Sequence, residues 1–355
     1  MRLLSAPLRM GIFITHKCNL TCKHCSAFPT REYKDEFNTS EWINFFDVIS
    51  NLKIFEVDIS GGEPFVRNDI LTLLEYLNKK RIPIRINTNG TLIDKEIAQK
   101  ISKLNMIKNI QVSLEGSNSE INDKIRGNGS FEKALIGIKN LKKYYKNFLT
   151  TFVTVTKYNY NDLENIVKLC KKLKLNSINF SYMVPVGNAI KNSEEIALSI
   201  KENVELIQKI GTLYEKYGGI VTGSLLQAYH INKKLELKSN EIDENAKANY
   251  FSGCNTTLNY CNITATGDVI PCDRLWDIKA GNIRERDFQD IWINSDVFNN
   301  FRKRFSMTLN EIPECKICKY KSICNGGCIA SFYYLTGSTI GFDPLSCYKV
   351  LKGEK

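Results

Sequence analysis

The chain of 355 residues is 43% hydrophobic and 25% charged, which is typical of a globular protein with one large domain, or with one large and one smaller domain. No apolar run approaches the roughly 18 residues of a membrane span. Pro7 and Arg9 interrupt the N-terminal segment, so it does not read as a signal peptide, and we expect a cytoplasmic protein with no membrane partner. Lys and Arg (49) exceed Asp and Glu (38), which gives a net charge of +11. This charge indicates a Lys-rich solvated surface, or one that attracts an acidic peptide. Nucleic acid is a minor option because the chain has no dense basic tail.

Strand-like and helix-like segments alternate through the first two-thirds of the chain. The predicted strands span residues 10–15, 55–60, 84–87, 109–114, 148–156 and 177–183. The predicted helices begin near residues 38, 69, 94, 130, 162 and 195. Six consecutive strand–helix units predict an α/β fold with a parallel sheet. Because a closed barrel needs eight such units, we expect a partial (β/α)6 barrel.

The chain is expected to divide into three parts. Residues 1–220 form the partial barrel, and the polar residues 221–250 form a connector of loops and a short helix. Residues 251–355 hold eight of the twelve cysteines, which indicates a second module built around them. Since the chain lacks an export signal, clustered cysteines indicate metal binding or catalysis rather than disulfides. Only three histidines are present, so any metal is held mainly by sulfur.

Three cysteines stand close together in the sequence CNLTCKHC, after the first predicted strand. Cys18, Cys22 and Cys25 are separated by three and then two residues, and no fourth cysteine is near. A [4Fe–4S] cluster has four irons that cysteines normally bind, so three thiolates leave one iron open to a substrate or cofactor. The alternative from spacing alone is a zinc site completed from elsewhere, for example by His24.

This loop resembles the cysteine motif of the radical SAM superfamily, and ISGGEPF at residues 59–65 resembles that family's glycine-rich motif after the second strand. The resemblance covers about residues 8–220. It implies a cluster whose open iron binds S-adenosylmethionine, which is cleaved to a 5′-deoxyadenosyl radical. Gly61 and Gly62 would let the backbone approach a ligand closely. Pro64 would stiffen the turn, and Glu63 would fix its geometry.

Three further stretches resemble the family more weakly. In NTNG, the resemblance implies that Asn89 faces the cofactor. In QVSLEGS, Ser113 and Glu115 would bond the ribose hydroxyls, although the family more often has Asp in place of Glu. In IRG, Arg126 would pair with the carboxylate of the methionine moiety. For each of these four residues, a turn-forming or solvated role is the alternative.

The cysteines of the last third resemble the SPASM domain pattern over residues 254–347. Cys254 is followed by twelve residues, Gly267, four residues and Cys272, and the next four cysteines have the spacing CX2CX5CX3C. The resemblance implies two auxiliary [4Fe–4S] clusters, and therefore three clusters in the chain. The first would be bound by Cys254, Cys261, Cys272 and Cys328. The second would be bound by Cys315, Cys318, Cys324 and Cys347.

Two cysteines, Cys261 and Cys170, fall outside these spacings. Cys261 is not part of the SPASM spacing, and without it one iron of the first auxiliary cluster would be open. Cys170 belongs to neither set and is expected to pack inside a helix. Without the N-terminal loop, the C-terminal spacing would suit zinc as well as iron.

Auxiliary clusters offer an exit for the electron that remains after hydrogen abstraction, so the resemblance implies an oxidation. A base would take the proton. Asp273, in the sequence PCD, resembles the proposed base of anaerobic sulfatase-maturing enzymes, and a turn-capping role is the alternative. An external reductant of the flavodoxin or ferredoxin type is expected as a partner.

SPASM proteins mostly act on peptides or proteins, so the resemblance implies oxidative modification or crosslinking of a ribosomally made peptide. The basic surface suits an acidic leader peptide, while the seven residues before the first strand leave no room for the leader-binding domain of several relatives. Two alternatives are protein oxidation as in sulfatase maturation, and oxidation or decarboxylation of a small molecule such as a haem precursor. An alternative of another class is a zinc-bearing nucleic-acid-binding protein.

Overall fold

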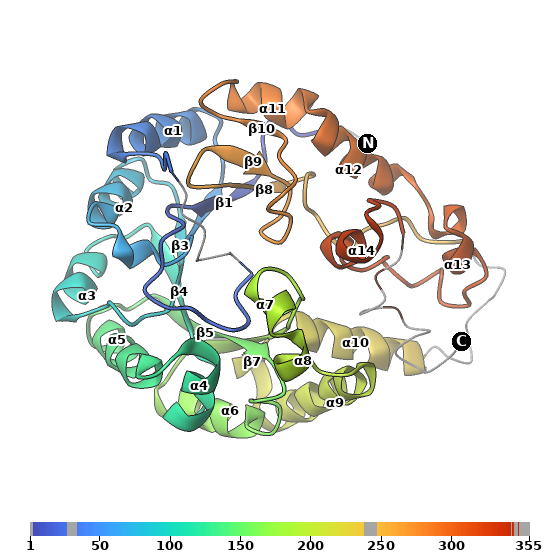
Figure 1. Cartoon of the computed structure of the whole chain (residues 1–355), viewed down its shortest axis with the longest axis horizontal. Coiled ribbons are helices and arrows are strands. Elements are labelled where there is room, and N and C mark those ends of the chain that lie inside the picture. The colour runs from blue at the N-terminus through green and yellow to red at the C-terminus, as the bar shows by residue number, and fades with distance from the viewer. Residues whose placement is uncertain (1–2, 27–33, 238–246, 342, 344–346, 348–355) are drawn as a thin grey trace.

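The computed structural model describes residues 3–26, 34–237, 247–341, 343 and 347, and within these residues ten strands form a single sheet (Figure 1). The strand order is β10-β9-β8-β1-β2-β3-β4-β5-β6-β7. All neighbours from β8 to β7 are parallel. Most of the helices lie outside the curved sheet, which confirms the predicted partial (β/α)6 barrel.

The six expected strand–helix units are all present. The barrel strands are β1 (Arg9–Phe13), β2 (Glu56–Ser60), β3 (Ile84–Thr88), β4 (Ile107–Ser113), β5 (Phe148–Val155), β6 (Ser177–Tyr182) and β7 (Val221–Thr222). The helices of this part are α1 (Thr39–Asn51), α2 (Ile70–Lys79), α3 (Lys95–Ile101), α4 (Ser119–Arg126), α5 (Ser130–Tyr144), α6 (Leu163–Lys172), α7 (Asn188–Lys191), α8 (Ser193–Ile196), α9 (Ile200–Tyr217) and α10 (Ser224–Leu237). The sequence did not predict α4, whose eight residues are mostly polar and whose start is capped by the side chain of Asn118.

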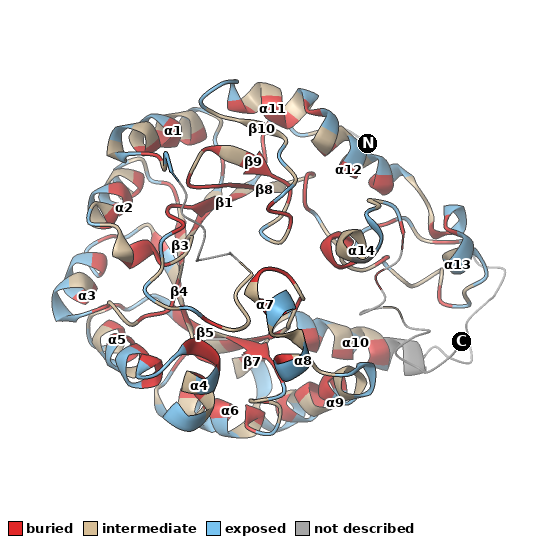
Figure 2. Ribbon diagram, viewed as in Figure 1, coloured by how far each residue is buried: buried red, intermediate tan, exposed pale blue. Residues whose placement is uncertain are grey.

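The two faces of the sheet differ in polarity because side chains alternate along each strand. In β4, Ile110 and Val112 are fully buried, whereas Gln111 and Ser113 line the inner cavity. Buried residues lie along the strands and on the sides of the helices that face them (Figure 2). The hydrophobic core is therefore between sheet and helices, and the inside of the barrel is left for polar side chains.

The C-terminal third extends the barrel sheet. Strand β8 (Tyr260–Ile263) runs parallel to β1, and β9 (Asp268–Ile270) and β10 (Gly281–Asn282) continue the sheet antiparallel. The remaining helices are α11 (Phe288–Asn294), α12 (Asp296–Lys303), α13 (Pro313–Lys316) and α14 (Ile329–Thr336). Short 3-10 helices lie at Pro64–Val66, Gly218–Ile220, Arg304–Ser306 and Leu309–Glu311. The C-terminal module and the barrel thus share one sheet.

The segment expected to be a connector is more ordered than the sequence suggests. Residues 221–237 form β7 and the 14-residue helix α10, in which Leu225 and Tyr229 are buried. The Tyr229 ring packs against Gly211 of α9, where a Cβ would lie 2.1 Å from the ring. The loop expected at residues 238–246 lies outside the described residues. Every helix in the described part of the chain is too short or too polar to span a bilayer.

Candidate active site at the carboxyl ends of the strands

The carboxyl ends of the barrel strands surround a cavity of about 430 Å³. The predicted site residues on its wall are Cys18, Cys22, Cys25, Gly61, Gly62, Asn89, Ser113, Arg126 and Asp273. They come from separate strand ends and from the C-terminal third, and the parallel topology brings them together. The predicted residues Glu63, Pro64 and Glu115 are buried behind this wall.

The backbone of the cysteine loop is fixed to the barrel on two sides. The Lys23 amide donates to the Ile125 carbonyl at the end of α4, at 2.9 Å. The Asn188 amide, at the start of α7, donates to the Cys25 carbonyl at 2.9 Å. Because the loop is hydrogen-bonded to α4 on one side and to α7 on the other, its backbone is constrained where it carries the three thiols.

Two thiols of this loop accept hydrogen bonds from predicted cofactor residues. Arg126 Nη1 donates to Cys22 Sγ at 3.8 Å, and Asn89 Nδ2 donates to Cys18 Sγ at 4.0 Å. Burial raises the pKa of Cys18 to about 11, and the nearby Cys22 thiol also raises it. Iron binds the thiolate form, so the positive metal would relieve the cost of burying these sulfurs as anions.

Gly61 and Gly62 pack against the segment that leads into the cysteine loop. A Cβ on Gly61 would lie 2.3 Å from the Thr15 carbonyl oxygen, and one on Gly62 would lie 2.2 Å from that of Lys17. The amides of Gly62 and Glu63 donate to these two carbonyls, each at 2.8 Å. The glycines therefore allow two backbone segments to meet at the cavity wall, an approach of protein to protein that the sequence did not predict.

Glu63 joins the GGEP motif to the NTNG motif. Its Oε1 accepts from Thr88 Oγ1 at 2.7 Å and from the Phe65 amide at 3.2 Å, and its Oε2 accepts from the Asn89 amide at 2.6 Å. Pro64 is the first residue of a 3-10 helix. Burial raises the pKa of Glu63 to about 7, although these donors favour the ionised form. These contacts hold the turn and the strand end in one arrangement.

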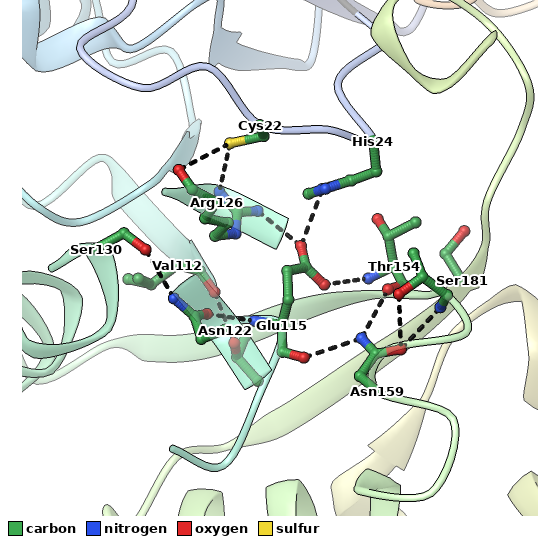
Figure 3. Close-up of polar contacts among 12 residues, drawn as sticks. Cys22, His24, Val112, Glu115, Asn122, Arg126, Ser130, Thr154, Asn159 and Ser181 are labelled. Atoms are coloured by element: carbon green, nitrogen blue, oxygen red, sulfur yellow. Dashed lines mark hydrogen bonds and ion pairs between the residues drawn. The ribbon is translucent and has the colours of Figure 1, made fainter. Parts of the chain in front are cut away.

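Glu115 is not exposed to the cavity. Its Oε1 accepts from Arg126 Nη2 at 2.7 Å and lies 3.1 Å from His24 Nε2, and its Oε2 accepts from the Thr154 amide at 2.7 Å (Figure 3). Burial favours the neutral acid, but His24 and Arg126 outweigh it and hold the pKa of Glu115 below its ordinary value. The ribose contact expected for Glu115 would require this carboxylate to leave its present partners.

The C-terminal cysteines form two sets whose members influence one another electrostatically. The first set is Cys254, Cys272 and Cys328. The second set is Cys315, Cys318, Cys324 and Cys347. Burial, together with the other thiols of the second set, raises the pKa of Cys315 to about 12 and that of Cys324 to about 11. Apart from Cys261, this grouping follows the SPASM assignment.

Cys261 lies away from the first set. It pairs with Met10 of β1 and is fully buried in the core between the sheet and the helices, where the charged group that acts on its thiol is Arg302. Its neighbour Tyr260 lines the cavity. Because side chains alternate along β8, Cys261 points to the opposite face from the cavity, and the structure does not bring it to the thiols it was expected to join.

Asp273 connects the first set of thiols with the cavity. Cys272 Sγ donates to Asp273 Oδ1 at 3.1 Å. Asp273 and Arg274 both line the cavity, and the Arg274 side chain hydrogen-bonds Cys328. The cavity that begins at the N-terminal cysteine loop therefore extends to two residues that are hydrogen-bonded to thiols of the first C-terminal set.

A family model described as the radical SAM superfamily matches residues 12–170, and an iron–sulfur cluster-binding domain model, SPASM, matches residues 254–319. The Fe-coproporphyrin III synthase of Methanosarcina barkeri is 30% identical over 352 residues, which cover 94% of this chain and 86% of that protein. The chain belongs to the radical SAM superfamily.

Other relatives of this radical SAM protein span nearly its whole length. The AdoMet-dependent heme synthase of M. barkeri is 28% identical, with 97% of each chain covered. The mycofactocin maturase MftC of Mycolicibacterium smegmatis is 27% identical, with 96% of this chain and 83% of MftC covered. The structure of Streptococcus suis SuiB bound to its precursor peptide SuiA shares the fold, with a TM-score of 0.77 at 20% identity over 98% of this chain and 77% of SuiB.

As a radical SAM enzyme with a SPASM domain, the protein uses S-adenosylmethionine and iron–sulfur clusters. The cysteine ligands that the chain offers fit iron–sulfur clusters, because three buried or half-buried thiols face one cavity and two further sets of thiols lie in the C-terminal third. Within the described ranges, no three His, Cys, Asp or Glu side chains form a group that could hold a single metal ion.

Two residues of this radical SAM site were not predicted as such from the sequence. His24 was considered only as a zinc ligand, and it instead lines the cavity and contacts Glu115. Arg274 was not singled out, and it lines the cavity beside the first C-terminal set. Each stands next to a predicted residue in sequence, which is the signal that could have identified it.

Proposed function

We propose that this enzyme oxidises or crosslinks a peptide during the maturation of a ribosomally made peptide. The observation that carries the proposal is that one cavity touches both redox regions: the N-terminal cysteine loop forms one part of its wall, and Asp273, bonded to Cys272, forms another. A substrate in this cavity would lie between the source of the radical and an exit for its second electron.

When bound, S-adenosylmethionine and the clusters supply a 5′-deoxyadenosyl radical, which takes one hydrogen atom, and an acceptor for the electron that the substrate then loses. The substrate also loses one proton, and Asp273 is the candidate to accept it because its side chain is exposed on the cavity wall. Cys272 Sγ lies 3.1 Å from Asp273 Oδ1. A cluster held by Cys272 would bind the thiolate, which cannot donate a proton to Oδ1, so this oxygen would be available to accept one from the substrate.

The proposed enzyme would hold three [4Fe–4S] clusters, one at each set of thiols. Asn89, Ser113 and the backbone at Gly61 and Gly62 face the same cavity and would contact S-adenosylmethionine. A flavodoxin or ferredoxin type of protein would supply the first electron, since the chemistry begins with a one-electron reduction.

A peptide substrate is supported by relatives rather than by any single contact. MftC, which matches 96% of this chain, is named as a maturase. SuiB, which shares the fold, was solved with its precursor peptide. The net charge of +11 would attract an acidic peptide over a long range.

The test is an anoxic reaction of the reconstituted enzyme with S-adenosylmethionine, dithionite and the short peptides encoded beside its gene. We expect one peptide to lose two hydrogen atoms as 5′-deoxyadenosine forms, both measured by mass spectrometry. Asp273→Asn should lower the yield of oxidised peptide by about 100-fold or more while 5′-deoxyadenosine still forms. The matched control is Asp277→Asn, since Asp277 is exposed but is not on the cavity wall. Equal yields from the two variants would remove Asp273 as the base.

A second candidate substrate is an iron–porphyrin precursor. It is favoured by the heme synthase and Fe-coproporphyrin III synthase relatives, which match 97% and 94% of this chain. Arg9 and Arg85 also line the cavity and could contact porphyrin carboxylates, although both now pair with Asp58. The same assay with iron–coproporphyrin separates the two candidates, because loss of carboxyl groups from the porphyrin with no change in any peptide would replace the peptide proposal.

A further inference from the structure

We propose that Glu115 is a positioning residue that orients Arg126 and His24 beside the iron-binding thiols and balances the charge of Arg126, and that it does not bind the cofactor ribose. The inference rests on the proposed cluster at the N-terminal cysteine loop. The sequence motif implied a different role for this carboxylate, which was contact with the ribose of the cofactor.

The carboxylate of Glu115 is enclosed and already bonded through both oxygens. Its side chain has no exposed surface, and its three partners are Arg126 Nη2, His24 Nε2 and the Thr154 amide, at 2.7, 3.1 and 2.7 Å. The backbone is fixed as well, since its amide donates to Asn122 Oδ1 and its carbonyl accepts from Asn159 Nδ2, each at 2.9 Å. A carboxylate held at so many points is not free to turn toward a ligand in the cavity.

The side-chain partners of Glu115 lead directly to the cysteine loop (Figure 3). Arg126 also donates from Nη1 to Cys22 Sγ at 3.8 Å. His24 lies in the loop itself, between Cys22 and Cys25. One carboxylate on the end of β4 therefore ties the loop and its arginine to the barrel, in the way that outer-shell carboxylates orient the ligands of metal sites.

Glu115 also determines which nitrogen atoms remain for a ligand. Its oxygens occupy His24 Nε2 and Arg126 Nη2. The buried atoms His24 Nδ1 and Arg126 Nε have no hydrogen-bond partner among the described residues, and both side chains line the cavity. Glu115 thus leaves His24 Nδ1 and Arg126 Nε as the nitrogen atoms of these two cavity-lining side chains that a ligand could engage.

The charge of Glu115 balances that of Arg126. Both side chains are buried, with exposures of 0% and 9%, so their interaction is poorly screened by solvent. If Glu115 became neutral, the positive charge beside Cys22 would be uncompensated. A more positive surrounding favours the reduced and more negative state of a cluster, so its reduction potential would rise.

The test compares Glu115→Gln with Glu120→Gln in the anoxic holoenzyme. Glu120 pairs with Lys124 on the exposed face of α4, with its side chain 80% exposed, so its variant is the matched control. The midpoint potential is measured by a redox titration of the paramagnetic resonance signal that changes when S-adenosylmethionine is added, because that change identifies the cluster that binds the cofactor. We expect Glu115→Gln to raise this potential, and Glu120→Gln to leave it unchanged.

The double variant Glu115→Gln with Arg126→Gln keeps the test decisive if the single variant fails to fold or to take up iron. Removing both charges should bring the iron content and the potential back toward the wild-type values. The result that overturns the proposal is an unchanged potential in Glu115→Gln together with at least tenfold weaker binding of S-adenosylmethionine, which is the behaviour of a ribose ligand. Absence of the cofactor-responsive signal in the wild-type enzyme would instead refute the proposed N-terminal cluster.

Discussion

Cys261 of β8 pairs with Met10 of β1, and both side chains are fully buried on the helix side of the sheet. The adjacent pair, Gly11 and Asn262, faces the other way, because a Cβ on Gly11 would lie 1.9 Å from Asn262 Oδ1. A slip of the register by one residue would exchange the faces of the whole of β8. This pairing therefore decides whether Cys261 can reach iron.

The first prediction concerns iron content. Cys261→Ala should retain its iron, because this thiol is buried in the core between the sheet and the helices and the charged group that acts on it is Arg302 rather than a thiol of the first set. Cys272→Ala should lose one cluster, or about four irons per chain. Iron and sulfide analysis of the anoxically purified proteins measures both. A loss of about four irons in Cys261→Ala as well would make Cys261 the fourth ligand that the SPASM resemblance implies.

The second prediction concerns the packing of β1 on β8. Gly11→Ala should lower the free energy of unfolding by about 1–3 kcal/mol, since the new methyl group overlaps Asn262 and lies 2.5 Å from the Tyr260 hydroxyl. The control is Gly219→Ala, where a Cβ meets no atom within 4 Å and the change should stay within about 0.5 kcal/mol. Urea unfolding followed by circular dichroism compares the two. Adding Asn262→Ala should restore part of the loss, and equal effects at both glycines would argue against this register.

The third prediction is a pH dependence that belongs to Glu63. Burial raises its pKa from 4.5 to about 7, so between these values the folded protein holds a proton that the unfolded chain has lost. The free energy of unfolding contributed by this group therefore falls as the pH rises through this window, by about 3 kcal/mol in total. Thermal midpoints of the wild type and Glu63→Gln from about pH 5 to about pH 8 measure the effect. The variant should show a smaller fall, and identical slopes would mean that Glu63 is ionised throughout.

The fourth prediction separates packed from iron-binding thiols. Cys170 of α6 is fully buried, and burial raises its pKa to about 12, so iodoacetamide should not modify it in the native protein. Removal of iron with a chelator should expose the cysteines of the three sets to the reagent and leave Cys170 unmodified. Peptide mapping by mass spectrometry distinguishes them. Modification of Cys170 before unfolding would show that α6 opens in the native state.

The sequence predicted the barrel and most of the site because the relevant signals are local. The spacing of Cys18, Cys22 and Cys25 and the GGEP turn are each contained in one strand–loop connection. Their meeting at one cavity follows from parallel strands alone, and the structure confirms the fold class that predicts it. The apolar spacing of the helices that the sequence predicted likewise reports their buried faces without reference to the rest of the chain.

The features that the sequence did not predict depend on pairings between distant segments. Nothing local to Cys261 shows that β8 joins β1, and only that pairing sets the face on which Cys261 lies. Glu115 is a motif residue by position, but its burial depends on Arg126 at the end of α4 and on His24 in the cysteine loop. Helix α10 was read as connector because its charged surface hides a buried face that appears only when Tyr229 meets α9.

The most direct measurement is the cleavage of S-adenosylmethionine by the anoxic, dithionite-reduced protein and by its Cys22→Ala variant. If three thiolates leave one iron for the cofactor, the wild type should form 5′-deoxyadenosine. The variant should form none and should lack about four irons. A Cys22→Ala protein that still forms 5′-deoxyadenosine at the wild-type rate would contradict the assignment of this loop as the site of radical formation.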